Sequence, residues 1–273
     1  MLHSAAMTEL CRLCGGPATE RFRQHVLGRY DARYSECASC HSLQTEPPFW
    51  LDEAYSALDA TPDIGFMRRN LLMSALTAEA LRAAGVGPDD LCLDWGAGFG
   101  LFCRLLRDSG FNFLAYDKYA ESRYAWDKRV QNPAGLAPRV ITAFEVFEHL
   151  PNPARDLEEL FNFRPQLLIF STEIYSGQPA DWWYFDPPTG QHVFFYSRAA
   201  LEWVAARYGY RLVFLDPAWA FVRPDCPLEA GPWVQSGLDS LLHELKTDPW
   251  RWVGRDYEAL LAARRAKAPS PEP

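Results

Sequence analysis

Four cysteines near the start of the chain form two Cys-x-x-Cys pairs, Cys11 with Cys14 and Cys37 with Cys40. Four thiolates at this spacing can surround a zinc ion tetrahedrally. A redox dithiol, which needs only one pair at the start of a helix, and an iron–sulfur site are the alternatives. Four protein ligands leave a zinc ion no open coordination position, so we expect a structural zinc rather than a catalytic one.

The other three cysteines are isolated at Cys92, Cys103 and Cys226. An odd total of seven, with four in metal-type spacing, does not suggest a disulfide framework. We expect the three to be small apolar fillers, as free cysteines usually are. The first ten residues have neither a basic segment nor an apolar one, so nothing indicates export and we expect a cytoplasmic protein.

A second candidate site is the glycine-rich stretch DWGAGFG at 94–100, which follows a short apolar run. Glycine lets a backbone turn tightly and approach a ligand without an intervening Cβ. A dinucleotide-binding fingerprint would need its third glycine where this chain has Leu101. An acid before the loop, Asp94, and another at the end of the following strand, Asp117, suit a ligand that carries an amine and a ribose.

Two further segments contain acids, histidines and aromatic residues. After an apolar run at 140–144, Glu145 is a candidate for a cofactor contact, whereas Glu148 and His149 could instead serve a turn and a helix start, because carboxylates favour helix N-termini. Residues 181–197 hold two adjacent tryptophans, which cannot both point inward from one strand. His192 opens an apolar run there, and such a lone histidine is usually a hydrogen-bonded core or turn residue.

The elements that must position these residues alternate between strand and helix periodicity beyond residue 66. We predict strands at 91–94, 111–116, 140–144, 167–171, 211–215 and 219–222, and helices at 66–84, from 101, at 153–163 opened by Asn152, and from a Ser197 cap to 208. This alternation predicts a doubly wound α/β fold with a mainly parallel sheet and ligands at its carboxyl edge. Residues 11–46 lack such a period, so a metal is expected to fold them.

Composition and charge narrow the class of protein. The 273 residues are 48% hydrophobic and 14% aromatic, and no apolar run is long enough to span a bilayer. The net charge of −8 argues against a nucleic-acid backbone as the main partner, because that binding rests on clustered Lys and Arg. The surplus of aromatic side chains indicates a lined pocket.

The DWGAGFG loop and Asp117 resemble the first motifs of the class I S-adenosylmethionine (SAM) dependent methyltransferases, a Rossmann-like fold. The resemblance implies that Asp94 and the loop hold the methionyl and ribose portions of SAM, that Asp117 takes the ribose hydroxyls, and that the backbone at residues 143–145 flanks the sulfonium. The cofactor contacts so implied are Asp94, Gly96, Ala97, Gly98, Gly100, Asp117, Phe144 and Glu145. Neither a third strand nor an acid for the adenine follows Asp117, which leaves Tyr119 and Trp126 as unassigned candidates to cover it.

The cysteine module, the loop, residues 145–153 and the run from His192 to Ser197 together resemble zinc-domain sugar C-methyltransferases, from about residue 11 to 222. In that family the histidine of the last run is tied to proton removal, which implies His192 as the catalytic base, with Tyr184 or Glu148 as helpers. The relay differs, because Gln191 stands where the family has Glu and Thr189 where it has Tyr.

The expected protein is therefore a SAM-dependent methyltransferase acting on a small polar acceptor, a nucleotide sugar or a glycan. One alternative is an RNA methyltransferase whose zinc module binds nucleic acid, and the other is a non-catalytic SAM-binding protein. We expect a zinc-ribbon-like module at 1–46, a helical connector at 47–88, the methyltransferase domain at 89–225 and a helical extension with a tail at 226–273. The acceptor atom and the oligomeric state do not follow from the sequence.

Overall fold

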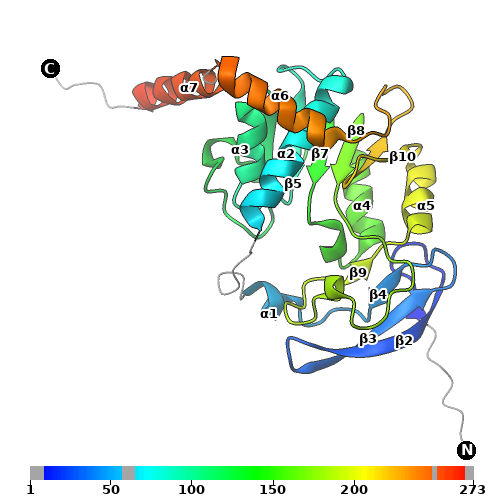
Figure 1. Ribbon diagram of the computed structural model, residues 1–273. Coiled ribbons are helices and arrows are strands. Elements are labelled where there is room, and N and C mark those ends of the chain that lie inside the picture. The colour runs from blue at the N-terminus through cyan, green and yellow to red at the C-terminus, as the bar shows by residue number, and fades with distance from the viewer. Residues whose placement is uncertain (1–8, 57–64, 248–250, 268–273) are drawn as a thin grey trace, which may run out of the picture.

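The structure is a computed structural model that describes residues 9–56, 65–247 and 251–267 (Figure 1). The expectations about the first eight residues and the end of the tail lie outside these residues. Within them, none of the helices is both long enough and apolar enough to cross a membrane.

The central sheet confirms the predicted α/β fold. Its strand order is β10-β11-β8-β7-β5-β6, in which β5, β6, β7 and β8 are parallel and β10 and β11 are antiparallel additions at one edge. The strands are β5 (Leu91–Trp95), β6 (Asn112–Tyr116), β7 (Val140–Ala143), β8 (Leu167–Phe170), β10 (Arg211–Phe214) and β11 (Trp219–Val222). All six predicted strands are present, and residues 117–139 contain no strand, only a short helical turn, η1 (Trp126–Lys128).

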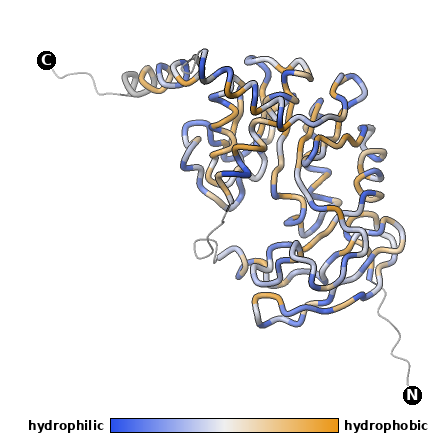
Figure 2. The backbone as a smooth tube through the Cα atoms, in the orientation of Figure 1, coloured by the Kyte–Doolittle hydropathy of each residue, from blue (hydrophilic) through white to orange (hydrophobic). Residues whose placement is uncertain are grey.

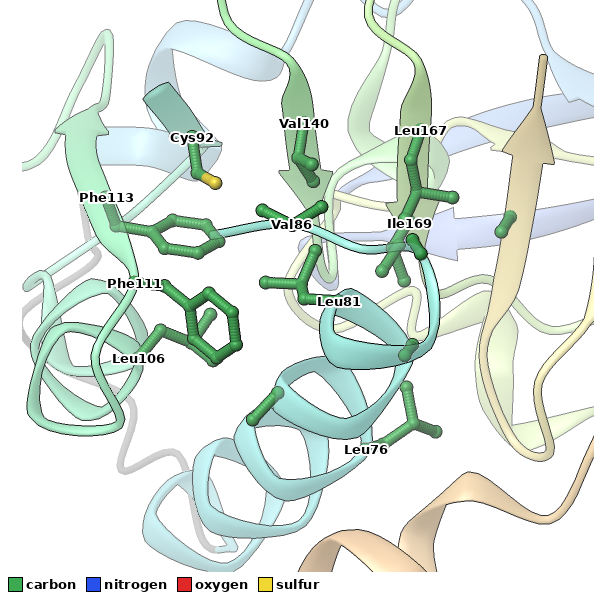
Figure 3. Packing of buried hydrophobic residues seen from close by; sticks show 14 of the residues in the cluster. Leu76, Leu81, Val86, Cys92, Leu106, Phe111, Phe113, Val140, Leu167 and Ile169 are labelled. Atoms are coloured by element: carbon green, nitrogen blue, oxygen red, sulfur yellow. The ribbon is translucent and has the colours of Figure 1, made fainter. Parts of the chain in front are cut away.

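Helices cover both faces of this sheet (Figure 1). One buried cluster joins the sheet to α2 (Phe66–Ala83) and α3 (Leu101–Asp108), and another joins it to α4 (Pro153–Asn162) and α5 (Arg198–Tyr208). Leu81 and Phe113 belong to the first cluster (Figure 3). The helices alternate between hydrophobic and hydrophilic residues along their length, as expected for helices with one buried face (Figure 2).

The helix ends follow the predicted signals with one exception. Ser197 accepts a hydrogen bond from the amide of Ala200 and caps α5 as expected. Asn152 precedes α4, but its side chain makes no cap bond. Its own amide donates to the carboxylate of Asp156 over 3.1 Å, so the acid one turn into the helix orders this end instead.

Two further helices follow the sheet. The helix α6 (Trp233–Thr247) packs on α2, where a Cβ at Gly237 would lie 2.1 Å from the carbonyl oxygen of Ala75. The helix α7 (Arg251–Lys267) is joined to α3 by hydrogen-bonded ion pairs from Arg104 and Arg107 to Asp256.

The N-terminal segment is an antiparallel sheet in the order β1-β2-β3-β4-β9. Its strands are β1 (Glu9–Leu10), β2 (Pro17–Val26), β3 (Tyr30–Cys37), β4 (Leu43–Thr45) and β9 (Phe194–Phe195). Residues 11–46, in which the sequence showed no long period, thus contain three of these strands. Most of β2 is exposed and polar, so it has no apolar alternation, and its pairing with β3 comes from the hairpin. The last strand arrives from a distant part of the chain, which joins this sheet to the methyltransferase region.

Candidate functional site

A pocket of about 180 Å³ opens at the carboxyl end of β5, beside the glycine loop. One wall is α2, and the others are the loop and the end of β7. The lining residues are Phe66, Arg69, Asn70, Met73, Asp94, Gly96, Ala97, Gly98, Phe102, Phe144 and Glu145. Six of the eight predicted cofactor residues are among them, whereas the α2 side chains were not foreseen, because their helical spacing resembled that of an ordinary core helix.

The glycine loop requires glycine at the two ends of its turn. Gly96 has a φ of 75°, and a Cβ there would lie 2.5 Å from a methyl carbon of Val146. Gly100 has a φ of 80° at the start of α3, where a Cβ would lie 2.3 Å from the hydroxyl of Ser122. The loop therefore has this path only because these side chains are absent.

Asp94 is a buried carboxylate on the pocket wall. The hydroxyl of Thr142 donates to its Oδ1 over 2.8 Å, and its Oδ2 is buried without a hydrogen-bond partner. Burial raises the pKa of Asp94 to about 7, since the ionised form is costly away from water. An unsatisfied oxygen of this kind calls for a donor, and the cationic amine of a bound ligand would supply one.

Asp117 accepts hydrogen bonds from three backbone amides. Its Oδ2 accepts from Gly98 over 2.8 Å, and its Oδ1 accepts from Tyr119 and Ala120, each over 2.7 Å. The bond from Gly98 holds the glycine loop against the end of β6, and the other two order the turn that follows Asp117. A carboxylate offers about four lone-pair sites, so roughly one remains for a ligand hydroxyl. Asp117 and Gly100 are the two predicted cofactor residues that do not line the pocket.

Glu145 lies at the pocket edge in a left-handed conformation, with a φ of 54°. Its amide donates to the hydroxyl oxygen of Ser171 over 2.8 Å, and that hydroxyl donates to Oε1 of Glu145 over 2.6 Å. The Nε of Arg69 lies 3.9 Å from its other carboxylate oxygen. Ser171 thus fixes this strained turn, while Arg69 places a positive charge in the pocket.

A second cluster consists of Glu148, His149 and His192. Glu148 and His149 belong to the short helical turn η2 (Phe147–His149), and His192 follows η3 (Trp183–Phe185). One ligand-type atom from each of the three side chains lies within 4.8 Å of the others. The two imidazole centres are 4.9 Å apart with perpendicular rings.

Each imidazole is oriented by one of its nitrogens. Nδ1 of His192 lies 2.6 Å from the carbonyl oxygen of Tyr184, so this nitrogen is the donor and Nε2 is left to accept. Nδ1 of His149 lies 3.3 Å from the hydroxyl of Tyr55 in α1 (Leu51–Ser56). Burial lowers the pKa of His192, and it lowers the pKa of His149 to about 3, so both rings are neutral near pH 7.

Glu148 is fully buried, and neither of its carboxylate oxygens has a hydrogen-bond partner. Burial raises its pKa to about 8, with a further contribution from the negative charge of Glu145. The structure shows no capping hydrogen bond from this side chain, since a capping carboxylate would accept helix amides. The charge of Glu145 also acts on His192, so the cluster adjoins the pocket.

The two positions that depart from the sugar C-methyltransferase pattern do not contact His192 by hydrogen bonds. The side-chain amide of Gln191 donates to the carbonyl of Ala54 over 3.1 Å, and the hydroxyl of Thr189 donates to Asp186 over 2.7 Å. These side chains fix the loop to α1 and to itself. The partners that orient the two histidines, Tyr184 and Tyr55, come from other segments.

Comparisons with known proteins decide the family. The profile of Methyltransf_23, described as a methyltransferase domain, matches residues 67–215. The chain belongs to this family of SAM-dependent methyltransferases. The predicted family and enzyme class are thereby confirmed. A search of curated proteins found no match.

Several solved methyltransferases are similar in fold to this one. The SAH-bound CalO1, from calicheamicin biosynthesis, is 15% identical over 55% of this chain and 54% of its own, with a TM-score of 0.39. This chain thus spans about half the length of CalO1. Magnesium protoporphyrin IX methyltransferase from Synechocystis PCC 6803 is 12% identical over 64% and 95%, with a TM-score of 0.44. The 1,6-didemethyltoxoflavin-N1-methyltransferase from Burkholderia thailandensis is 12% identical over 75% and 100%, with a TM-score of 0.47.

The four N-terminal cysteines of the methyltransferase converge on one point, as their spacing predicted. Their sulfurs all lie within 4.8 Å of one another, with 3.7 Å between Cys11 and Cys40 and 3.5 Å between Cys14 and Cys37. Four sulfurs about 2.3 Å from a zinc ion are roughly 3.8 Å apart, so the cluster fits a tetrahedral ion. The amide of Gly16 donates to a thiol sulfur over 3.5 Å, as expected around thiolates.

The cysteine module is attached to the methyltransferase core by Arg12, which the sequence did not single out. Its guanidinium donates to the carbonyls of Pro151, Thr45 and Val193 over 3.0, 3.1 and 2.7 Å. Burial lowers the pKa of Arg12 to about 10. The side chain therefore bonds both the cysteine sheet and the segments on either side of the Glu148 cluster.

The paired tryptophans point in different directions, as expected. Trp182 packs on Tyr184 and Phe185, with ring centres 5.2 Å apart in each case. Trp183 is 71% exposed. The three fillers Cys92, Cys103 and Cys226 are buried among apolar residues, as predicted.

Proposed function

We propose that this methyltransferase binds SAM in the pocket beside the glycine loop and transfers its methyl group to a nucleotide sugar or a glycan. The observation that carries the cofactor assignment is the buried, unpartnered Oδ2 of Asp94 beside a loop that admits no side chain at Gly96. Asp94 would accept the amine of the methionyl group. Arg69 would attract its carboxylate, and the amide-bound Asp117 would accept a ribose hydroxyl.

SAM supplies a methyl group on a sulfonium, whose sulfur keeps the bonding electron pair when the methyl carbon bonds to the acceptor. The protein has to place the acceptor within reach and remove its proton. Nε2 of His192 is free to accept that proton, because Nδ1 donates to the Tyr184 carbonyl and burial keeps the ring neutral. The hydroxyl of Tyr184 and the carboxyl group of Glu148 are the helpers on the acceptor side.

The sugar assignment rests on the resemblance to sugar C-methyltransferases and on the aromatic segment around Trp182 and Trp183, which suits the apolar face of a pyranose. We further propose that Cys11, Cys14, Cys37 and Cys40 hold a structural zinc ion. We also propose domain boundaries after residues 46, 88 and 225.

Titration calorimetry with S-adenosylhomocysteine (SAH) tests the cofactor site. We expect binding with a dissociation constant below about 100 μM, which corresponds to roughly −5.5 kcal/mol. Asp94→Asn should weaken it strongly, whereas Asp89→Asn, at an exposed position, should not. Absence of binding at 100 μM, or equal affinity in Asp94→Asn, would refute the site.

Release of SAH from SAM in the presence of nucleotide sugars, glycans or RNA tests the acceptor. We expect turnover with a nucleotide sugar or a glycan. A salt-dependent RNA complex with RNA-dependent turnover would favour the RNA methyltransferase instead. SAH affinity without turnover on any acceptor would favour a non-catalytic SAM-binding protein.

A further inference from the structure

We propose that Glu148, His149 and His192 form a second metal site, which binds a divalent first-row transition ion and is separate from the four-cysteine cluster. The proposal deepens the proposed function, on which its role in methyl transfer rests, because it places an ion beside the acceptor. The binding of the ion itself depends on neither SAM nor an acceptor.

The ligand set is the first reason. One carboxylate and two imidazoles are a combination found in zinc enzymes and in non-haem iron sites that keep open coordination positions. The three ligand atoms already lie within 4.8 Å of one another. Atoms bound about 2.1 Å from a common ion are roughly 3 to 3.5 Å apart, so small side-chain adjustments close the site.

The orientation of the histidines is the second reason. A metal-bound histidine usually donates its other ring nitrogen to an oxygen, which fixes the ring. Nδ1 of His192 meets the Tyr184 carbonyl at 2.6 Å, and Nδ1 of His149 meets the Tyr55 hydroxyl at 3.3 Å. His192 therefore keeps Nε2 for an ion, and Tyr55 orients the ring of His149.

The unpartnered carboxyl group of Glu148 is the third reason. Glu148 is completely buried, and both of its oxygens lack hydrogen-bond partners among the residues that the structure describes. A buried carboxylate without a partner is costly, and a divalent cation bound by it offsets that cost directly. No lysine or arginine forms an ion pair with Glu148 in this part of the chain, so the protein supplies no cation of its own there.

Three protein ligands leave coordination positions open. A hydroxyl oxygen of the acceptor would occupy one of them, and coordination lowers the pKa of that hydroxyl. Its proton would leave to solvent, and the oxygen would bond to the methyl carbon while the bond from that carbon to the SAM sulfur breaks and sulfur keeps the electron pair. His192 would then act as a ligand. Without the ion, His192 takes the proton itself.

Cobalt(II) titration of the full chain, with zinc retained in the cysteine cluster, tests the site. We expect one cobalt ion per chain in addition to zinc, with visible absorption but without the near-ultraviolet band of cobalt thiolates. Glu148→Gln and His192→Gln should each weaken cobalt binding at least about tenfold. His25→Gln, at an exposed histidine, is the matched control and should bind like the wild type.

Circular dichroism and zinc content show whether each variant is folded, and His149→Gln provides a third variant if one is not. The proposal is overturned if the wild type binds no cobalt at 1 mM, if folded variants bind it as tightly, or if bound cobalt has a thiolate band. The titration contains no SAM and no acceptor. Its failure would therefore leave the SAH-binding result untouched, and failed SAH binding would leave the ion site intact.

Discussion

The four-cysteine cluster and the Glu148, His149 and His192 cluster differ in how the chain assembles them. The cysteines come from two short loops of one small sheet, at fixed spacing along the sequence. The second cluster joins the end of β7 to a loop more than 40 residues later, and Tyr55 of α1 supports it. Local spacing makes the first visible in a sequence, whereas only packing creates the second.

The two clusters should also differ in whether they contribute to stability or to activity. Structural metal binding is folding free energy, because the site does not exist in the unfolded chain. The second cluster combines the buried Glu148 with two half-buried histidines beside a core that the sheet and helices hold together without it. We therefore expect substitutions in the first to reduce stability and substitutions in the second to reduce activity.

The largest effect is expected for Cys14→Ser, at the most exposed of the four cysteines, where lost packing matters least. Loss of the zinc ion should lower the free energy of unfolding by about 5 kcal/mol or more, since such ions bind with roughly 10 to 16 kcal/mol. Elemental analysis and chemical denaturation measure this. Cys226→Ser, at a buried filler, is the control and should keep the zinc. An equal zinc content in the two variants would contradict a structural zinc.

Asp94→Asn should raise stability while it weakens SAH binding. The pKa of Asp94 is about 7 in the folded protein and about 4 in an unfolded chain, so the folded state holds the proton more tightly. Ionisation therefore costs stability as the pH rises from about 4 to about 7, by up to about 4 kcal/mol. The variant's advantage should grow over this pH range and stay level above it. Denaturation at pH 4.5 and pH 8 measures it, and a constant difference would contradict the assignment.

His192→Gln should reduce turnover and leave stability nearly unchanged, whereas Cys14→Ser should reduce stability. We expect SAH release with a productive acceptor to fall by about 100-fold or more, as when a general base or a metal ligand is lost. The free energy of unfolding should change by less than about 1 kcal/mol. His25→Gln is again the control. A large loss of stability without a loss of turnover would contradict the expectation that the second cluster contributes to activity rather than to stability.

Arg12→Met should have the smallest effect. This variant tests how the cysteine module is attached to the methyltransferase core. Three carbonyl oxygens would lose the guanidinium as a donor, although that of Val193 keeps the Thr45 amide, and this should cost about 2 kcal/mol because the oxygens stay partly buried. Zinc content should remain that of the wild type, since Arg12 is not a ligand. Denaturation and elemental analysis check this. Loss of zinc would mean that the module depends on its attachment to the core.

The fold could be predicted largely because apolar runs of four or five residues alternate with helical periods along the chain. The strands from β5 to β11 and the Ser197 cap follow from local apolar spacing and capping chemistry. The N-terminal strands could not be found this way, because β2 is mostly exposed and β9 is two residues long. Their existence depends on cross-strand hydrogen bonds to distant partners.

The sequence by itself determined the cysteine cluster, the glycine loop and the acids at Asp94 and Asp117, because each lies within one turn or at one strand end. Only the tertiary structure decided that α2 closes the pocket, that Asp117 accepts the Gly98 amide, and that Glu148 is buried beside two histidines. Side-chain burial and partner choice depend on contacts between segments far apart in the chain. The spacing of residues along the sequence does not predict those contacts.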